Sequence, residues 1–190
     1  TIEDIQEYCL KQKQKLENLD KYEERFHEAE ENLKKSREEL ETVSHKLSVI
    51  RQKYSQMLTD KITEGLKDLN FLDVQFQITF RRRKEYTAGG FDDIEYEIST
   101  NPGESLKPLD KIVSGGELSR IMLAIKAILA DRDQIETLIF DEIDTGISGR
   151  TAQKVSEKMA VIGRCHQVLC ITHLPQIAAM ADTHFEIEKH

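Results

Sequence analysis

The chain has 190 residues and a formal net charge of −8, and 33% of its residues are charged. This charged fraction exceeds the roughly 25% typical of globular proteins and favours a long solvated helix. The acidic balance excludes a broad basic surface for nucleic acid. The three cysteines, an odd and sparse set, exclude a disulfide framework and fit a reducing cytoplasm. No apolar run reaches the roughly 18 residues that a membrane span needs.

Residues 1–69 are predicted to form one helix of a coiled coil. Gly65 is the first glycine, and proline is absent from this stretch. Apolar residues recur in two series with a spacing of seven residues. The series are Leu19, Phe26, Leu33, Leu40, Leu47 and Tyr54, and Tyr22, Ala29, Ser36, Val43, Ile50 and Met57. One helix cannot bury such a stripe, so we expect a partner helix from a second copy or from another part of a longer protein.

Residues 71–100 are predicted to form a β-hairpin. Apolar and polar residues alternate over 74–80 and again over 94–98, as in half-buried strands. We expect a long polar loop around residues 89–90 between the two strands. The basic run at residues 81–84 is interpreted as a solvated edge of the hairpin, because short charge runs usually lie on the surface.

From Ser114 onward, apolar helices alternate with short buried strands. This order predicts an α/β fold with a largely parallel sheet. The predicted helices cover residues 121–130, 151–161 and 174–181, and the predicted strands cover residues 137–140, 167–172 and 184–188. The expected organisation is therefore an arm helix at residues 1–69 followed by a lobe at residues 70–190.

A glycine-rich segment begins at Val113 and continues as Ser114, Gly115, Gly116 and Glu117. Glycines allow a ligand close to the backbone, and the free N–H groups at the start of a helix attract phosphate. Taken alone, the segment favours an ordinary helix in which the serine is the N-cap.

Two further polar sites follow predicted buried strands. Asp141 and Glu142 come directly after residues 137–140, where an α/β sheet binds ligands. An aspartate at this point can hold Mg²⁺ through water, and a glutamate can orient an attacking water. His173 follows the next strand and could bind a phosphate. Each site alone is also compatible with a strand that runs into an ordinary polar loop.

The order of the three sites is more specific than any one of them. Residues 113–130, 137–142 and 171–173 resemble the signature motif, the Walker B motif and the switch histidine of ABC-type ATPases. The long preceding helix resembles the SMC-like branch. The runs at 98–104 and 141–149 resemble the members of that branch that act in DNA double-strand break repair and recombination in bacteria. Chromosome-organising SMC heads are the alternative, although Ser148 stands where their D-loop would carry an acidic residue.

The resemblance implies the C-terminal half of a P-loop ATPase head, with ATP and Mg²⁺ as ligands. It also implies specific roles: Ser114, Gly115, Gly116 and Glu117 contact ATP on an opposite head, Asp141 serves Mg²⁺ through water, Glu142 serves the attacking water, His173 contacts the γ-phosphate, and Arg120 is structural or interfacial. The implied partners are the N-terminal half of the same protein, a second head in a homodimer, and DNA, with a location at the bacterial nucleoid.

A phosphate-binding loop of the form Gly-x-x-x-x-Gly-Lys-Ser/Thr does not occur in the 190 residues. The chain alone is therefore expected neither to bind ATP tightly nor to hydrolyse it. A hypothesis of a different class also remains, namely a coiled-coil structural or interaction module whose globular part only caps the arm. That hypothesis explains residues 1–69 but not the ordered set of polar sites.

Overall fold

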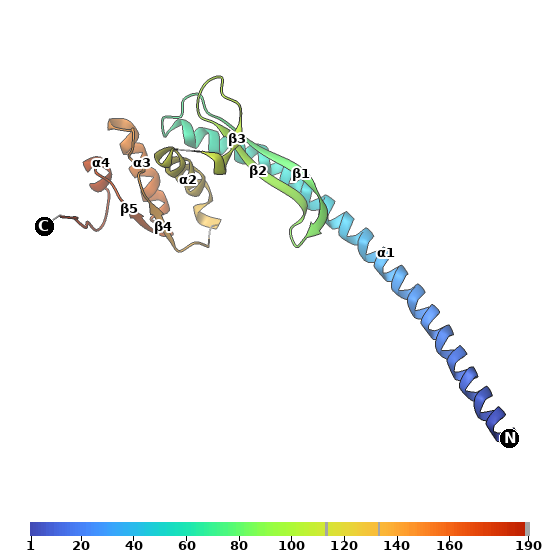
Figure 1. Cartoon of the computed structure of the whole chain (residues 1–190). Helices are drawn as coiled ribbons and strands as arrows, with labels where there is room; N and C mark the ends of the chain where they lie inside the picture. The colour runs from blue at the N-terminus through green and yellow to red at the C-terminus, as the bar shows by residue number, and fades with distance from the viewer. Residues whose placement is uncertain (113, 133, 189–190) are drawn as a thin grey trace. The chain divides into compact units, whose positions relative to one another are not determined.

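The computed structural model describes residues 1–112, 114–132 and 134–188, apart from the side chain of Asp20. Val113, the first residue of the predicted signature segment, lies outside the described residues. The chain divides into two compact units, which are described separately. The first comprises residues 1–50 and 84–91, and the second comprises residues 51–83 and 92–190. Figure 1 gives the order of the elements.

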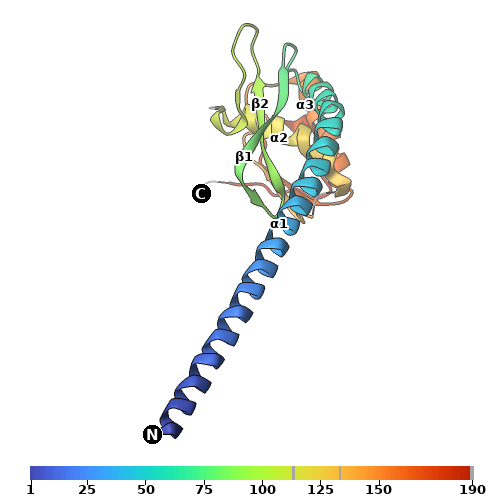
Figure 2. The ribbon, with the colours of Figure 1, turned by 90° about the vertical axis from the view of Figure 1, so that its right-hand side faces the viewer.

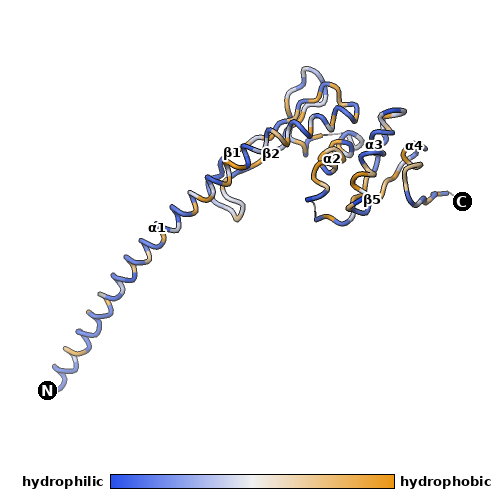
Figure 3. Tube along the Cα trace, turned by 180° about the vertical axis from the view of Figure 1, so that it is seen from behind, coloured by the Kyte–Doolittle hydropathy of each residue, from blue (hydrophilic) through white to orange (hydrophobic). Residues whose placement is uncertain are grey.

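The predicted arm is a single helix, α1, which runs over Ile2–Lys67. Its sequence favours a helix because it lacks proline and is rich in Glu, Lys, Gln and Leu. Figure 3 shows α1 as mainly hydrophilic, with isolated apolar residues along it. In the part of the chain that the structure describes, no helix combines the length and the apolarity that crossing a bilayer demands.

Within the first unit, most of the predicted apolar stripe of α1 is exposed to solvent, with 42% of Leu40 and 69% of Tyr22 exposed. Leu47 is the partly buried member of the stripe in this unit. The pairing of this stripe into a coiled coil stays a prediction. A neighbouring face is covered instead, since Ser44 and Ser48 are buried and the Ser44 side chain lies 3.7 Å from the point where Gly90 would carry a Cβ.

The predicted hairpin is present, but its predicted long loop is wrong. Strand β1 covers Gln75–Thr87 and strand β2 covers Gly90–Ser99, so only two residues separate them. They are neighbours in a three-stranded sheet, and β3 (Lys107–Pro108) pairs antiparallel with β2. Figure 2 shows β1 and β2 side by side.

Polar residues extend the two strands because charges pair across them. Arg81 lies 3.1 Å from Glu95, and Arg83 bonds to Asp93 with Nε 3.0 Å from Oδ1. Opposite charges across a ladder stabilise a solvated ribbon. This pairing supports the interpretation of the basic run as a solvated edge.

The second unit contains the α/β lobe. A parallel pair of strands, β4 (Thr137–Phe140) and β5 (Gln167–Cys170), aligns Thr137 with Gln167 and Phe140 with Cys170. The helices are α2 (Gly115–Leu129), α3 (Gly149–Ile162) and the short α4 (Pro175–Ala178), with 3₁₀ turns η1 at Leu109–Lys111 and η2 at Ala130–Arg132. The α/β prediction is confirmed.

The predicted strand at residues 184–188 is wrong. Its apolar residues Phe185 and Ile187 are 88% and 89% exposed. Within residues 1–112, 114–132 and 134–188, no strand pairs with this segment. A strand requires a ladder partner, and an alternating sequence does not supply one.

The core of the second unit joins the end of α1 to the lobe. Ile62 and Leu66 of α1 are fully buried, as are Ile121 of α2 and Val155 of α3. Burial of each such side chain contributes about 1.5–3 kcal/mol. The end of the arm helix is thus part of the lobe's core.

Candidate nucleotide site

The candidate site begins at the start of α2. Ser114 is the N-cap residue, and its side chain accepts a hydrogen bond from the backbone N–H of Glu117 at 3.4 Å. Gly115 and Gly116 form the first two positions of the helix. The ordinary capping role of the serine is therefore present, and it leaves the glycines at a helix end that suits an anion.

The two glycines lie against the loop that follows β4. A Cβ on Gly115 would lie 2.5 Å from Glu142 Oε2, and one on Gly116 would lie 2.9 Å from the backbone oxygen of Glu142. No side chain larger than hydrogen fits Gly116 without a shift of the backbone. The structure thus brings two of the three sequence motifs into contact.

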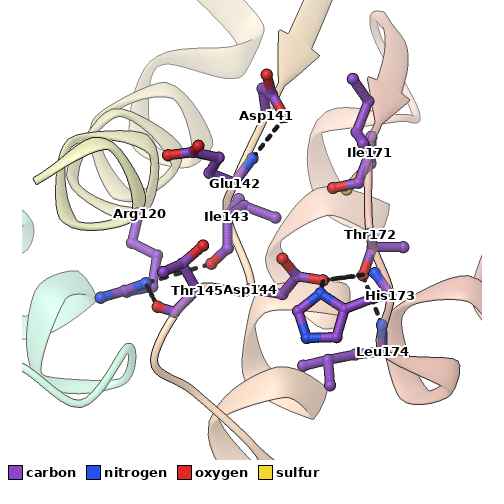
Figure 4. A network of polar contacts seen from close by, with 11 residues as sticks. Arg120, Asp141, Glu142, Ile143, Asp144, Thr145, Ile171, Thr172, His173 and Leu174 are labelled. Atoms are coloured by element: carbon purple, nitrogen blue, oxygen red, sulfur yellow. Dashed lines mark hydrogen bonds and ion pairs between the residues drawn. The ribbon is translucent and has the colours of Figure 1, made fainter.

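Asp141 and Glu142 begin that loop, and both are exposed. Asp141 Oδ1 accepts a hydrogen bond from the Glu142 N–H at 2.8 Å, and the Asp141 backbone oxygen accepts one from Ser119 Oγ at 2.8 Å. Glu142 has φ +54°, in the left-handed region that costs a non-glycine residue about 1–2 kcal/mol. In this conformation the glutamate side chain points toward α2, as Figure 4 shows.

Arg120 ties α2 to the same loop. Its side chain is buried, and Nη1 donates to the backbone oxygens of Ile143 at 3.3 Å and Thr145 at 2.8 Å. The guanidinium lies 5.6 Å from the ring centre of Phe71, and its Nε has no hydrogen-bond partner among the described residues. Burial lowers the pKa of Arg120, although the nearby Glu117 opposes the shift. These contacts match the structural role expected for Arg120.

His173 is joined to the loop by a residue that the sequence analysis did not select. Asp144 is 4% exposed, and its Oδ2 accepts hydrogen bonds from the Thr172 hydroxyl and from the His173 N–H at 2.8 Å. The same oxygen lies 3.1 Å from His173 Nδ1, while the His173 side chain is 75% exposed. Figure 4 shows Asp144 between the two segments.

All three motifs therefore meet at the loop that follows β4. Asp141 has an outward carboxylate suited to a cation bound through water. The described residues contain no cluster of three or more His, Cys, Asp or Glu that could hold a metal directly. Ser148, at the start of α3, makes no capping side-chain hydrogen bond within the described chain.

Comparison with known proteins identifies the family. No protein-family model matches the chain. Over its whole length, however, the chain is 42% identical to the DNA repair protein RecN of Halalkalibacterium halodurans and 39% identical to that of Bacillus subtilis. The chain belongs to the RecN family. It spans 34% and 35% of the length of these two RecN proteins.

A solved structure agrees with this fold. The crystal structure of the Smc head domain with an extended coiled coil from Pyrococcus furiosus, bound to the C-terminal domain of ScpA, has a TM-score of 0.50 with this chain. The alignment covers 73% of the RecN-family chain and 33% of the Smc chain, with 19% identity. At this identity the likeness concerns the fold alone, which is that of part of an SMC-type head.

Proposed function

We propose that this chain is the C-terminal part of an SMC-like ATPase that acts in DNA repair in the bacterial cytoplasm. In this proposal Asp141 holds Mg²⁺ through water, Glu142 orients the water that attacks ATP, and His173 contacts the γ-phosphate. Magnesium would supply charge neutralisation at the phosphates. The glycine segment at residues 114–117 would contact the nucleotide of a second head.

The observation that carries the proposal is the convergence of the three motifs at one loop. Gly115 lies against the Glu142 carboxylate, and Asp144 of the same loop bonds the backbone of His173. Gly115 and Glu142 are 27 positions apart along the chain and Asp144 and His173 are 29, but the two pairs meet beyond the carboxyl ends of β4 and β5. That edge is where open α/β sheets bind nucleotides. A cap without catalysis would not require this arrangement.

A bare face of the β4–β5 sheet supports a missing partner segment. Ile139, Leu169 and Ile171 are exposed by 67%, 44% and 57%, whereas the opposite face packs on the core. Parallel strands are normally covered on both faces. We assign the cover to another segment of the same protein, because the chain spans only about a third of its relatives and lacks a phosphate-binding loop.

The apolar stripe of α1 has the same explanation. A helix from the missing part of the protein would cover the exposed residues of the stripe and complete the arm. A second head would complete the nucleotide site. DNA as the final target rests on the name of the RecN relatives rather than on any basic surface of this chain. A location at the nucleoid rests on the family resemblance alone.

The test is replacement of Glu142 by glutamine in the intact protein. ATP hydrolysis should fall by about 100-fold or more while ATP binding is retained, because the amide cannot accept a proton from water. Glu136→Gln, at the exposed opposite end of β4, is the matched control and should leave hydrolysis unchanged. Unchanged hydrolysis in Glu142→Gln would instead favour the structural module. The 190-residue chain alone should show no hydrolysis.

A further inference from the structure

Asp144 is a buried carboxylate whose contacts concentrate on one oxygen. Oδ2 faces the Thr172 hydroxyl, the His173 N–H at 2.8 Å and His173 Nδ1 at 3.1 Å. The Thr172 oxygen in turn accepts a hydrogen bond from the Leu174 N–H at 3.1 Å. The carboxylate therefore organises three consecutive residues after β5, although it belongs to the loop after β4.

These contacts favour the ionised carboxylate. Burial opposes the charge, but the Thr172 hydroxyl, the His173 N–H and the His173 ring together hold the pKa of Asp144 below its usual value. An ionised carboxylate can only accept hydrogen bonds. Its contact with the ring is therefore a hydrogen bond only when Nδ1 carries the proton.

The geometry also gives the two nitrogens of the His173 ring different surroundings. Nδ1 faces the buried carboxylate, whereas the side chain as a whole is 75% exposed. Nε2 is thus the ring nitrogen left for a ligand. A carboxylate that fixes one nitrogen of a histidine sets both its tautomer and its orientation, and loss of such a partner typically lowers metal affinity or activity by about 10- to 100-fold.

We propose that Asp144 is a positioning residue, which holds His173 with the proton on Nδ1 and presents Nε2 to the phosphate of the nucleotide. This inference rests on the proposed ATPase function. It assigns a role to Asp144 beyond joining two loops, because a simple join would need only the contacts with the Thr172 hydroxyl and the His173 N–H. The role depends on His173, and this dependence makes it testable.

The experiment measures ATP hydrolysis by the intact protein and its variants. Asp144→Asn replaces the acceptor by an amide that can donate to Nδ1, so kcat should fall by about 10- to 100-fold with KM nearly unchanged. In a His173→Ala background the same substitution should have almost no further effect on kcat. Thr172→Val, which removes another contact of the same oxygen, is the matched control and should change kcat by less than about threefold.

Three outcomes overturn the inference. One is unchanged kcat in Asp144→Asn. Another is an equal loss in both backgrounds, which would mean that Asp144 is only a structural tie. The third comes from two variants of His173, which do not depend on the folding of Asp144→Asn. The amide of His173→Gln can reach the place of Nε2, whereas the amide of His173→Asn can reach only the place of Nδ1, so His173→Gln should keep more activity. Equal activity, or more activity in His173→Asn, contradicts the assignment. An intact wild-type protein without hydrolysis refutes the proposed function itself, a result distinct from all three.

Discussion

Replacing Gly116 by alanine tests how closely α2 packs on the loop after β4. The added methyl would lie 2.9 Å from the backbone oxygen of Glu142, 3.0 Å from Thr145 Cβ and 3.2 Å from Arg120 Nη1. A backbone oxygen cannot rotate away, so the helix and the loop must separate. Overpacking of this kind costs about 1–3 kcal/mol, and the better helix propensity of alanine returns up to about 1 kcal/mol.

Gly115→Ala is the matched control, because it has the same helix gain and a different clash. Its methyl would meet Oε2 of Glu142 at 2.5 Å, which is the far end of a flexible side chain that can rotate away. The difference between the two variants therefore isolates the backbone clash. At about 2–4 °C per kcal/mol for a chain of this size, Gly116→Ala should melt about 2–12 °C below Gly115→Ala. Calorimetry of the 190-residue chain measures both, and equal melting temperatures would refute the packing described for this loop.

Iodoacetamide at pH 8 should label the exposed Cys9 and Cys165 before Cys170. Burial, and to a smaller extent the charges of Asp144 and Asp141, raise the pKa of Cys170 to about 11. Peptide mass spectrometry measures the labelling, and equal labelling of the three cysteines would contradict this prediction. Arg120→Met should destabilise the chain by about 1–3 kcal/mol for each backbone oxygen left without its donor, and calorimetry that finds no loss would contradict the buried contacts. The folded-state pKa of Asp144 lies below the usual value of an aspartate, so its carboxylate adds stability that is complete above the unfolded pKa and is lost as pH falls through the folded pKa. The stability difference between wild type and Asp144→Asn, from calorimetry in a series of acidic buffers, should therefore shrink with acid; a difference that grows with acid would have the wrong sign.

The regular elements of the lobe were predictable because each leaves a local pattern. The predicted strand at 137–140 is β4, and the strand predicted at 167–172 is β5, which ends two residues earlier, at Cys170. The helix predicted at 151–161 is α3, two residues longer at its start and one at its end. The helix at 121–130 begins earlier, at Gly115, because the serine cap and not the first apolar residue sets its start.

The errors share a physical cause, which is that pairing partners are not written in local sequence. The hairpin strands continue through polar residues because each charge meets an opposite charge across the ladder. The segment at 184–188 alternates like a strand but pairs with none of the described strands. In both cases the deciding contact is with residues elsewhere in the chain, and composition does not reveal it.

The arm shows the same limit at the level of single residues. The sequence marks an apolar stripe, and most of it is exposed, as the need for an external partner requires. It does not mark the serine face at Ser44 and Ser48, which is buried although it is polar. Small side chains let the backbone of Gly90, with φ +87°, approach the helix closely. Polar residues are expected to be exposed, so the sequence pattern predicts that this serine face is exposed.

The sequence analysis did not select Asp144 because the contacts of this residue are with a distant segment of the chain. These contacts help to hold the site together. Ser119 and Arg120 of α2 bond backbone oxygens of the loop after β4, and Asp144 of that loop bonds His173. A ligand that displaces the start of α2 must therefore break these bonds or carry the loop with it. Under the proposed function, contact of the glycine segment with a second head's nucleotide would reach both Glu142 and His173 by this route. Under that function, the hydrogen bonds that connect two nucleotide sites are accepted by backbone oxygens and by one buried carboxylate. None of these hydrogen bonds can be read from a sequence motif.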